Sequence, residues 1–384
     1  MDLLQPPNRL LRLYREYQNN EVISLHYNFT GKLNTSRYKG GLKAEAVFFL
    51  VVCVFIVLEN LIVLLALWRN KKFHSPMFYL LGNLTLSDLL AGVAYIVNIL
   101  MSGANTLRLT PAMWFVREGG VFITLTASIF SLLAIAIERH ITMVRMKHYS
   151  GDKKGRMALL IGAAWLVSIL LGVLPILGWN CISNLQSCST ILPLYSKNYL
   201  LVCISIFLAI LIAIVVLYLR IYRIVKVNSQ RLGTLRKGTL KKSQKYMALL
   251  KTVTIVVGTF IMCWLPLFVL FLFDVSCEVN ACPILLKADY FLGLAMINSL
   301  LNPIIYTLTS RDIRRAILKL VFCLCLSSDE GEGRRRLWFL PVIEGSTSKS
   351  EKSSHKHEAL ETTVSSGNGT PTPVKCLMPK NVDY

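Results

Sequence analysis

Two adjacent residues of opposite charge, Arg117 and Glu118, open a long segment that is otherwise mainly apolar. Neighbouring side chains on a helix point about 100° apart, so both charges could face one cavity. A guanidinium binds phosphate in bidentate geometry, and a carboxylate binds an ammonium group. The pair therefore suits a zwitterionic ligand, and an ion pair in a membrane headgroup zone explains it equally well.

A second set of polar residues lies in the middle of apolar segments. Asp88 is the clearest case, because an ionisable group at the centre of a membrane helix costs at least about 2.5–3.5 kcal/mol. Oxygen-bearing side chains from other segments could meet it and coordinate a hydrated sodium ion. Equally, the set could be a polar cluster that joins helices. Its further members are Asn60, Ser128, Asn298, Ser299 and Asn302.

These residues are set in a chain with the composition of a membrane protein. Of its 384 residues, 54% are hydrophobic and only 16% are charged, where a soluble domain carries about 25% charged residues. Its long charge-free stretches match the roughly 20 residues that a helix needs to cross a bilayer. The sequence predicts an all-α seven-transmembrane helix bundle with spans at 43–69, 76–103, 113–146, 157–178, 195–226, 246–274 and 284–309.

The net charge of +21 follows the loops and not a nucleic-acid site. Three alternate connections, 69–74, 139–156 and 220–251, hold 19 Lys and Arg in total, and the other three hold 4. Excess Lys and Arg marks the cytoplasmic side. We therefore expect an extracellular N-terminus, a cytoplasmic C-terminus and attraction to anionic membrane lipid, with no nucleic-acid binding.

Segments outside the spans divide the chain further. Residues 1–42 are predicted to form an extracellular N-terminal segment, and residues 43–310 the bundle. Residues 311–325 are predicted to form a short amphipathic eighth helix on the membrane surface, and residues 326–384 a disordered cytoplasmic tail. The N-terminal segment carries two glycosylation acceptors, and the eighth helix ends in two candidate palmitoylation sites. These are Asn28 and Asn34, and Cys323 and Cys325.

Cysteines occur in pairs in two predicted outer loops. Cys181 and Cys188 share one loop, and Cys277 and Cys282 share another. Such pairs oxidise outside the cell, so each is expected to form a disulfide that closes a short loop. Four free thiols are the alternative.

Two proline kinks and a Glu-Arg pair complete a specific combination. The sixth span holds Trp264 and Pro266, and the seventh holds Asn302-Pro303-Ile304-Ile305-Tyr306. Proline frees a backbone carbonyl that neighbours can satisfy in more than one arrangement. Glu138 and Arg139 end the third span, where either a reversible ion pair or simple interfacial anchoring fits.

With these motifs, residues 43–322 resemble the rhodopsin-like G-protein-coupled receptors. The resemblance implies that Trp264 senses ligand and that Arg139, Tyr218 and Tyr306 rearrange as the sixth span swings outward. Two departures exist. The head of the third span lacks the family's usual cysteine, and the fifth span lacks its usual proline. Both are similar to the lysophospholipid branch, in which the second outer loop carries an internal bridge, here Cys181–Cys188.

Local sequences over about residues 20–325 are similar to the sphingosine 1-phosphate receptors, most like subtype five with subtype three next. The matches include His26–Leu33, Trp114–Gly119 and Cys188–Tyr195. The resemblance implies a phosphate held by Arg117 and Lys32 with Tyr27, and an ammonium held by Glu118 and Asn98. Lys287 could also cover the phosphate, although each exposed Lys is individually a weak indication.

Apolar candidates below this charged rim could hold an alkyl chain. An aromatic stripe is more often helix packing than ligand contact, but a charged rim over an apolar shaft is what a long-chain zwitterion needs. The candidates are Phe122, Leu125, Phe207, Trp264, Leu267, Phe268 and Phe271.

The sequence therefore predicts a plasma-membrane receptor for sphingosine 1-phosphate, and not an enzyme, with no cofactor beyond a sodium ion. The resemblance implies heterotrimeric G proteins of the Gi/o and twelve/thirteen classes as partners, and receptor kinases and arrestin at the Ser/Thr-rich tail. Two alternatives stay open. A transporter or channel would show internal repeats, which are not apparent. A lysophosphatidic acid receptor would resemble this pattern with Gln in place of Glu118.

Overall fold

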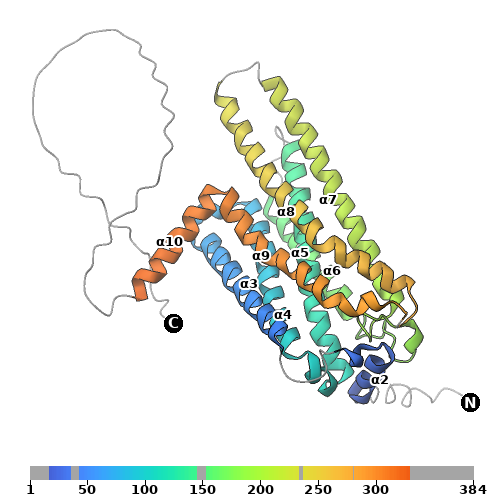
Figure 1. The fold of residues 1–384 in the computed structure, drawn as a ribbon. Coiled ribbons are helices and arrows are strands. Elements are labelled where there is room, and N and C mark those ends of the chain that lie inside the picture. The colour runs from blue at the N-terminus through green and yellow to red at the C-terminus, as the bar shows by residue number, and fades with distance from the viewer. Residues whose placement is uncertain (1–16, 36–42, 145–152, 233–236, 280, 329–384) are drawn as a thin grey trace, which may run out of the picture. The chain divides into compact units, whose positions relative to one another are not determined.

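The computed structural model describes residues 17–35, 43–144, 153–232, 237–279 and 281–328. Seven of the helices in these ranges are long and apolar enough to cross a membrane. They confirm the predicted all-α seven-helix bundle (Figure 1). They are α3 (Ala44–Arg69), α4 (Pro76–Leu100), α5 (Pro111–Val144), α6 (Lys153–Val173), α7 (Lys197–Leu232), α8 (Lys237–Ser276) and α9 (Ala288–Thr309).

Most helix bounds lie within a few residues of the predicted spans, and the differences have local causes. α6 ends at Val173, earlier than predicted, because Pro175 disfavours helical backbone in the residue before it. α7 continues to Leu232 and α8 begins at Lys237, so both extend into the predicted basic connection. Lys, Arg, Leu and Gln dominate that connection and are good helix formers.

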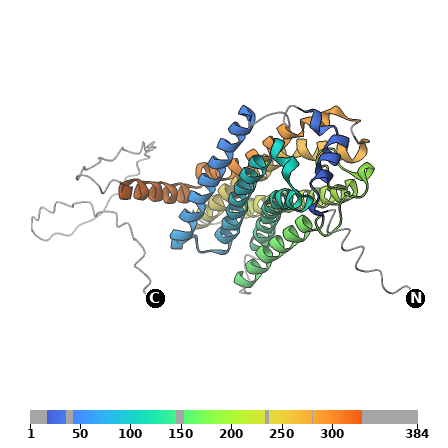
Figure 2. The ribbon, with the colours of Figure 1, turned by 90° about the horizontal axis from the view of Figure 1, so that it is seen from below.

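α5 lies in the middle of the bundle. It packs against α4, α6 and α7, while α9 packs against α3, α4 and α8. Figures 1 and 2 show the same arrangement from two directions, with α3 and α4 on one side and α7 and α8 on the other. Side chains on several faces of α5 therefore lie in the interior of the bundle.

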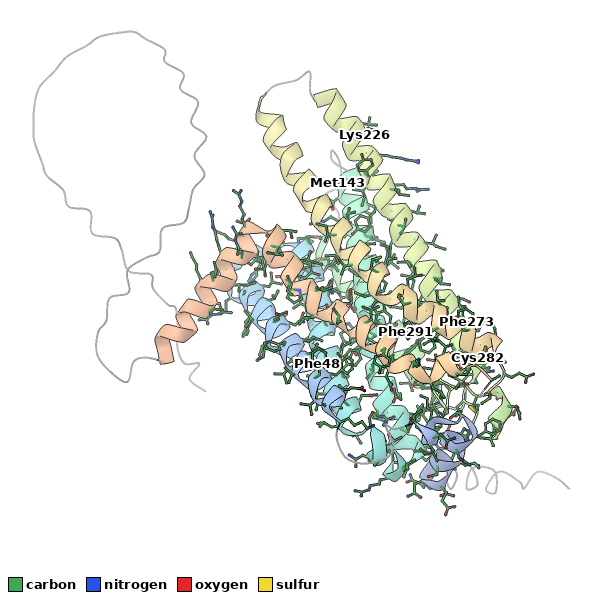
Figure 3. The ribbon with its side chains drawn as sticks, in the orientation of Figure 1. Phe48, Met143, Lys226, Phe273, Cys282 and Phe291 are labelled. Carbon is green, nitrogen blue, oxygen red and sulfur yellow. A yellow bond between two sulfur atoms is a disulfide. The ribbon has the colours of Figure 1, made fainter. Side chains whose placement is uncertain are left out.

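The distribution of polarity is that of a membrane protein. The outer face of α3 exposes Phe48, Val51 and Phe55, and Figure 3 labels Phe48. The interior instead holds polar side chains such as Asn60 and Asp88, both with no exposed surface. Exposed apolar surface on this scale requires lipid around it. The protein is a multi-pass membrane protein.

Short elements and both disulfides lie at one end of the bundle, which we call the disulfide end. The structure joins Cys181 to Cys188 and Cys277 to Cys282. Figure 3 labels Cys282 at this end and Met143 at the opposite end. A helix that is not among the predicted elements, α2 (Glu21–Phe29), also lies here and is followed by the 3-10 turn η1 (Lys32–Asn34).

The predicted amphipathic eighth helix is α10 (Arg311–Ser328), which follows α9 after Ser310. Ile313 and Ala316 are buried, and Arg311 and Arg314 are exposed, so the apolar and basic residues separate as the sequence predicts. The side chains of the two candidate palmitoylation sites in its last turns lie outside the described residues.

Candidate functional site

Arg117 and Glu118 lie in the second turn of α5 and bond to each other. Nε and Nη2 of Arg117 donate to Oε1 of Glu118 at 3.0 and 2.6 Å. The Arg117 side chain is 3% exposed and the Glu118 side chain 17%. The two charges therefore form an ion pair in which Arg117 is buried and Glu118 is partly exposed.

The connection between α4 and α5 encloses the remaining face of the guanidinium. Nη1 of Arg117 donates to the carbonyl of Met101 at 2.7 Å and to the hydroxyl of Thr106 at 3.1 Å. The guanidinium carbon also lies 5.8 Å from the Trp114 ring centre, within cation–π range. This cage fixes the direction in which the guanidinium points.

A glycine contact sets how closely α5 approaches α6 beside the charged pair. A Cβ on Gly119 would lie 3.0 Å from the carbonyl oxygen of Gly172, and one on Gly172 would lie 2.3 Å from Cγ1 of Ile123. Neither position has room for a side chain without movement of a backbone or a branched residue. Gly119, directly after Glu118, thus fixes the distance between the Arg117–Glu118 pair and α6.

An aromatic wall joins α2 to the head of α5. Trp114 Nε1 donates to the Tyr27 hydroxyl at 2.9 Å, and both side chains are buried. The rings of Trp114 and Phe115 both lie against Tyr195, at centroid distances of 5.5 and 5.7 Å. Burial raises the pKa of the Tyr27 phenol, so the hydroxyl is neutral at physiological pH and can donate a hydrogen bond.

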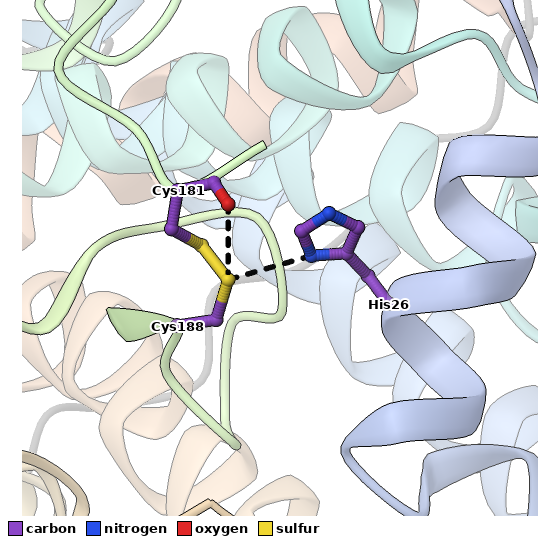
Figure 4. A group of neighbouring side chains, drawn as sticks. All are labelled: His26, Cys181 and Cys188. Carbon is purple, nitrogen blue, oxygen red and sulfur yellow. Dashed lines mark hydrogen bonds between the residues drawn. A yellow bond between two sulfur atoms is a disulfide. The ribbon is translucent and has the colours of Figure 1, made fainter. Parts of the chain in front are cut away.

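His26 docks α2 on the loop that carries the first disulfide, as Figure 4 shows. Its imidazole has no exposed surface. Nδ1 lies 3.0 Å from the carbonyl oxygen of Pro193, and Nε2 lies 3.2 Å from that of Ile182. The side chain of Lys32 also donates to the carbonyl of Ile191. The N-terminal segment is thus held as a cap over this loop.

The group formed by His26, Cys181 and Cys188 has the residue types of a metal site. Its ligand atoms lie within 4.8 Å of one another. However, the two sulfur atoms are bonded to each other, and metal binding needs thiolates. The arrangement is a buried histidine packed on a disulfide (Figure 4).

We expect acidification to weaken the docking of α2. Burial lowers the pKa of His26 from its ordinary 6.5 and outweighs the two carbonyl contacts, which raise it. An undocked His26 therefore binds a proton more readily than a docked one. The contribution of neutral His26 to the docking of α2 is fully present above about pH 6.5 and is lost as the pH falls further. Amide hydrogen exchange of residues 21–29, corrected for intrinsic rates, should show lower protection at about pH 5.5 than at about pH 7.4.

The matched control for that measurement is His26→Gln, which has no titrating ring. This variant should show the same corrected protection at both pH values. Equal protection at both pH values in the wild type would contradict the expectation.

A cavity of about 490 Å³ opens between α3, α4 and α9. Its lining includes three of the predicted ligand-binding residues, Asn98, Glu118 and Lys287. Phe49 and Gly293 both line it and touch each other, since a Cβ on Gly293 would lie 2.6 Å from the Phe49 ring. Glu118 thus belongs both to the ion pair and to the cavity wall.

The predicted apolar shaft residues lie in three packed groups. Phe122, Phe207 and Phe268 form a chain of ring contacts at 5.7 and 6.1 Å, and Phe268 stacks on Trp264 at 5.7 Å. Leu125 packs beside Tyr95 and Met296. Phe271 packs beside Ile191 and Leu285, and Leu267 is buried. None of the seven is among the described residues that line the cavity.

Three members of the predicted polar set bond to Asp88, while Asn60 donates to the backbone carbonyls of Ile56 and Ser299. Oδ1 of Asp88 accepts from the hydroxyls of Ser128 and Ser299, both at 3.0 Å. Its Oδ2 accepts from Nδ2 of Asn302 at 2.8 Å. The amide oxygens of Asn298 and Asn302 are buried and have no hydrogen-bond partner among the described residues. Such a set of oxygens suits a hard cation.

Comparison with known proteins decides the family. The model of the rhodopsin family of seven-transmembrane receptors matches residues 59–306. Sphingosine 1-phosphate receptor 1 of Danio rerio is 52% identical over 362 residues, which are 91% of this chain and 99% of the relative. The chain belongs to the sphingosine 1-phosphate receptor family. It is therefore a receptor and not an enzyme, a transporter or a channel.

Other relatives in this receptor family are equally similar. Human sphingosine 1-phosphate receptor 5 is 52% identical over 381 residues, 93% of this chain and 96% of the relative. Sphingosine 1-phosphate receptor 3 of Takifugu rubripes is 57% identical over 310 residues, 80% of this chain and 79% of the relative. Both subtypes that the local motifs favour are thus among the relatives, and subtype one is as similar as subtype five.

At the opposite end of this receptor, Glu138 has a partner that the sequence does not predict. The Glu138 carboxylate accepts from Nε and Nη2 of Arg156 on α6, at 2.9 and 3.0 Å, and from Thr142 at 3.3 Å. Arg139 is its neighbour on α5, and Tyr218 interacts electrostatically with Arg139. An ion pair between Glu138 and Arg139 alone therefore does not describe how Glu138 is held at this end.

Three polar atoms of the predicted activation residues are buried without a hydrogen-bond partner among the described residues. They are Nε1 of Trp264 and the hydroxyls of Tyr218 and Tyr306. An unsatisfied buried polar group costs about 1–3 kcal/mol. Pro266 and Pro303 lie inside α8 and α9, where the sequence predicts kinks.

Both glycosylation acceptors are accessible. Asn28 is exposed on α2 and Asn34 is exposed at the end of η1.

Several polar contacts of the site are not predicted from the sequence. His26 appears in the motif but without a role, and Arg156 and Asp274 are not singled out. The one available signal for Asp274 is its position, since it is a carboxylate at the end of an apolar span.

Proposed function

We propose that this chain is a G-protein-coupled receptor for sphingosine 1-phosphate. The observation that carries the proposal is the ion pair between buried Arg117 and Glu118, which itself lines a cavity. Relatives named for this lipid support the same ligand. The ligand carries a phosphate and an ammonium group on one long alkyl chain.

A zwitterion can replace the internal ion pair without leaving either charge alone. The phosphate takes the guanidinium of Arg117 and the ammonium takes the carboxylate of Glu118, so one buried pair becomes two. A ligand with only a phosphate would separate Arg117 from Glu118 and leave a buried carboxylate unpaired. Breaking a buried pair in this way costs about 3–5 kcal/mol. The pair thus selects for the ammonium as well as the phosphate.

The cap and the cavity rim supply further contacts to the head group. Lys32 and Tyr27 approach the phosphate from the N-terminal cap, and Lys287 approaches it from the start of α9. Asn98 lines the cavity beside Glu118 and accepts from the ammonium through its amide oxygen. Because Lys32 already donates to the Ile191 carbonyl, it must turn toward the ligand.

The lipid reaches this site from the membrane, between α3 and α9. The cap covers the disulfide end, while Phe49 on α3 and Gly293 on α9 line the cavity, and their close contact must open for the lipid to pass. The alkyl chain then extends toward the stacked rings of Phe122, Phe207 and Phe268, with Leu125, Leu267 and Phe271 around them. These rings are in contact with one another, so they must separate to admit the chain.

A sodium ion can bind at Asp88. The carboxylate, the hydroxyls of Ser128 and Ser299, and the unpartnered amide oxygens of Asn298 and Asn302 would hold it. The ion would supply positive charge to a carboxylate that is otherwise buried among neutral groups.

Activation moves the inner end of α8 outward and admits a G protein of the Gi/o or twelve/thirteen class. Ligand contact with Trp264 would bias a two-state equilibrium about the kinks at Pro266 and Pro303. The unpartnered hydroxyls of Tyr218 and Tyr306 support a second arrangement, near Arg139, in which they are satisfied. Arg139 is then released toward the G protein.

The receptor acts at the plasma membrane, with its disulfide end outside and its tail in the cytosol. Disulfides and exposed acceptors at Asn28 and Asn34 suit the extracellular side. Cys323 and Cys325 carry palmitate, and the Ser/Thr-rich tail is phosphorylated by receptor kinases and then binds arrestin.

Binding of three lipids to the purified receptor tests the ligand. Sphingosine 1-phosphate should bind most tightly. Sphingosine lacks the phosphate and lysophosphatidic acid lacks the ammonium, so each should bind at least about 30-fold more weakly, the equivalent of about 2 kcal/mol. Equal affinity for all three lipids would overturn the proposal.

A further inference from the structure

Asp274 is a buried carboxylate at the disulfide end of α8, outside the ligand-binding set. Its side chain has no exposed surface. Oδ1 accepts from the backbone N–H of Thr190 at 2.8 Å, and Oδ2 accepts from the hydroxyl of Ser189. Both donors directly follow Cys188 in the loop that the first disulfide closes.

The contacted loop is a compact turn that reaches the charged pair. The Ser189 hydroxyl accepts from the N–H of Leu192 at 2.8 Å, and the N–H of Ser189 donates to the carbonyl of Tyr195 at 2.9 Å. The Tyr195 ring in turn packs on Trp114 and Phe115, in the turns that carry Arg117 and Glu118. One carboxylate on α8 is therefore connected, through seven loop residues, to the head-group site on α5.

Apolar packing holds the same segment against α8. Ile191, between Thr190 and Leu192, is buried in a cluster with Leu270, Leu285 and Ala288. The Ile191 carbonyl accepts from Lys32 of the cap. The turn thus contacts α8, the cap and the aromatic wall at once.

We propose that Asp274 is a positioning residue that couples the loop 189–195, and through it the Arg117–Glu118 site, to the movement of α8. The idea rests on the proposed receptor function. Pro266 lies between the inner end of α8 and Asp274. The coupling therefore requires that part of the inner-end movement passes Pro266 as a tilt of the outer end, which the two hydrogen bonds of Asp274 then transmit to the loop. By reciprocity, the loop then biases α8.

Amide hydrogen exchange across the receptor tests this coupling without any lipid. The full-length receptor is compared with and without an excess of nucleotide-free G protein, and exchange is measured in peptides covering 189–195. In the wild type, addition of the G protein should change the exchange rate of these peptides by about fivefold or more. Fivefold is the lower end of the typical coupling between two sites. No change in the wild type would overturn the inference.

Variants separate coupling from simple ordering of the loop. In Asp274→Ala the loop should exchange faster than in the wild type and should no longer respond to the G protein. Asp274→Asn keeps an oxygen acceptor for Thr190 and should retain most of the response. Glu278→Ala removes an exposed carboxylate at the same end and should behave as wild type. A full response in Asp274→Ala would overturn the inference.

A second arm keeps this result separate from the identity of the ligand. Sphingosine 1-phosphate is titrated into the same wild-type preparation. Absence of binding would sink the proposed ligand, while the exchange response to G protein would still decide the role of Asp274.

Discussion

Replacing Arg117 with Ala should greatly weaken the binding of sphingosine 1-phosphate and shift activation by this lipid to much higher concentrations. The variant loses the bidentate contact with the phosphate, and it also leaves Glu118 buried without its partner. Truncation of one member of a buried, hydrogen-bonded charge pair costs about 2–5 kcal/mol or more. The affinity should therefore fall by at least about 30-fold, measured as lipid binding to receptor whose surface expression has been verified.

Two further variants make this result specific to the guanidinium. Arg117→Lys keeps the charge but not the planar fork, so it should recover only part of the affinity. Arg108→Ala removes an exposed Arg at the same end and should leave binding unchanged. If Arg108→Ala weakened binding as much as Arg117→Ala, general attraction of an anionic lipid would explain the effect.

Glu118→Gln should move the lipid preference from sphingosine 1-phosphate toward lysophosphatidic acid. The amide cannot hold the ammonium as a carboxylate does, so the first lipid should lose about 10- to 100-fold in potency, as expected for a lost charge-assisted hydrogen bond. The second lipid should gain, because the phosphate no longer has to separate Arg117 from a carboxylate. Dose–response curves for both lipids measure the ratio.

Glu45→Gln is the matched control for that change. Glu45 also lines the cavity, but it is exposed and lies on α3. Its replacement should leave the lipid preference close to that of the wild type. A similar shift in both variants would mean that the general charge of the cavity, and not Glu118, sets the selectivity.

Length and polarity were sufficient to predict the bundle. In a bilayer every backbone polar group must be satisfied within the segment, so an apolar stretch long enough to cross has little choice but a helix. The amphipathic pattern of α10 was equally direct, because Ile313 and Ala316 alternate with arginines at helical spacing. The polar contacts of Asp88 also follow from the free-energy cost of burying a carboxylate, because a buried carboxylate requires hydrogen-bond partners.

Contacts between distant segments could not be predicted in this way. The pairing of Glu138 with Arg156 depends on how closely the last turns of α5 approach the first turn of α6, and neither local sequence contains that distance. The burial of His26 depends on a helix in a segment that reads as polar. For Arg117 and Glu118, adjacency predicts two charges facing a cavity, whereas their side chains bond to each other and only Glu118 is among the residues that line the cavity.

Dose-dependent G-protein activation in cells expressing the wild-type chain tests the central claim most directly. Sphingosine 1-phosphate and lysophosphatidic acid are compared in the same cells, with surface expression verified and untransfected cells as the background. The zwitterion exchange at Arg117 and Glu118 predicts a response to sphingosine 1-phosphate at concentrations at which lysophosphatidic acid has no effect. Silence to both lipids, or a stronger response to lysophosphatidic acid, would contradict it.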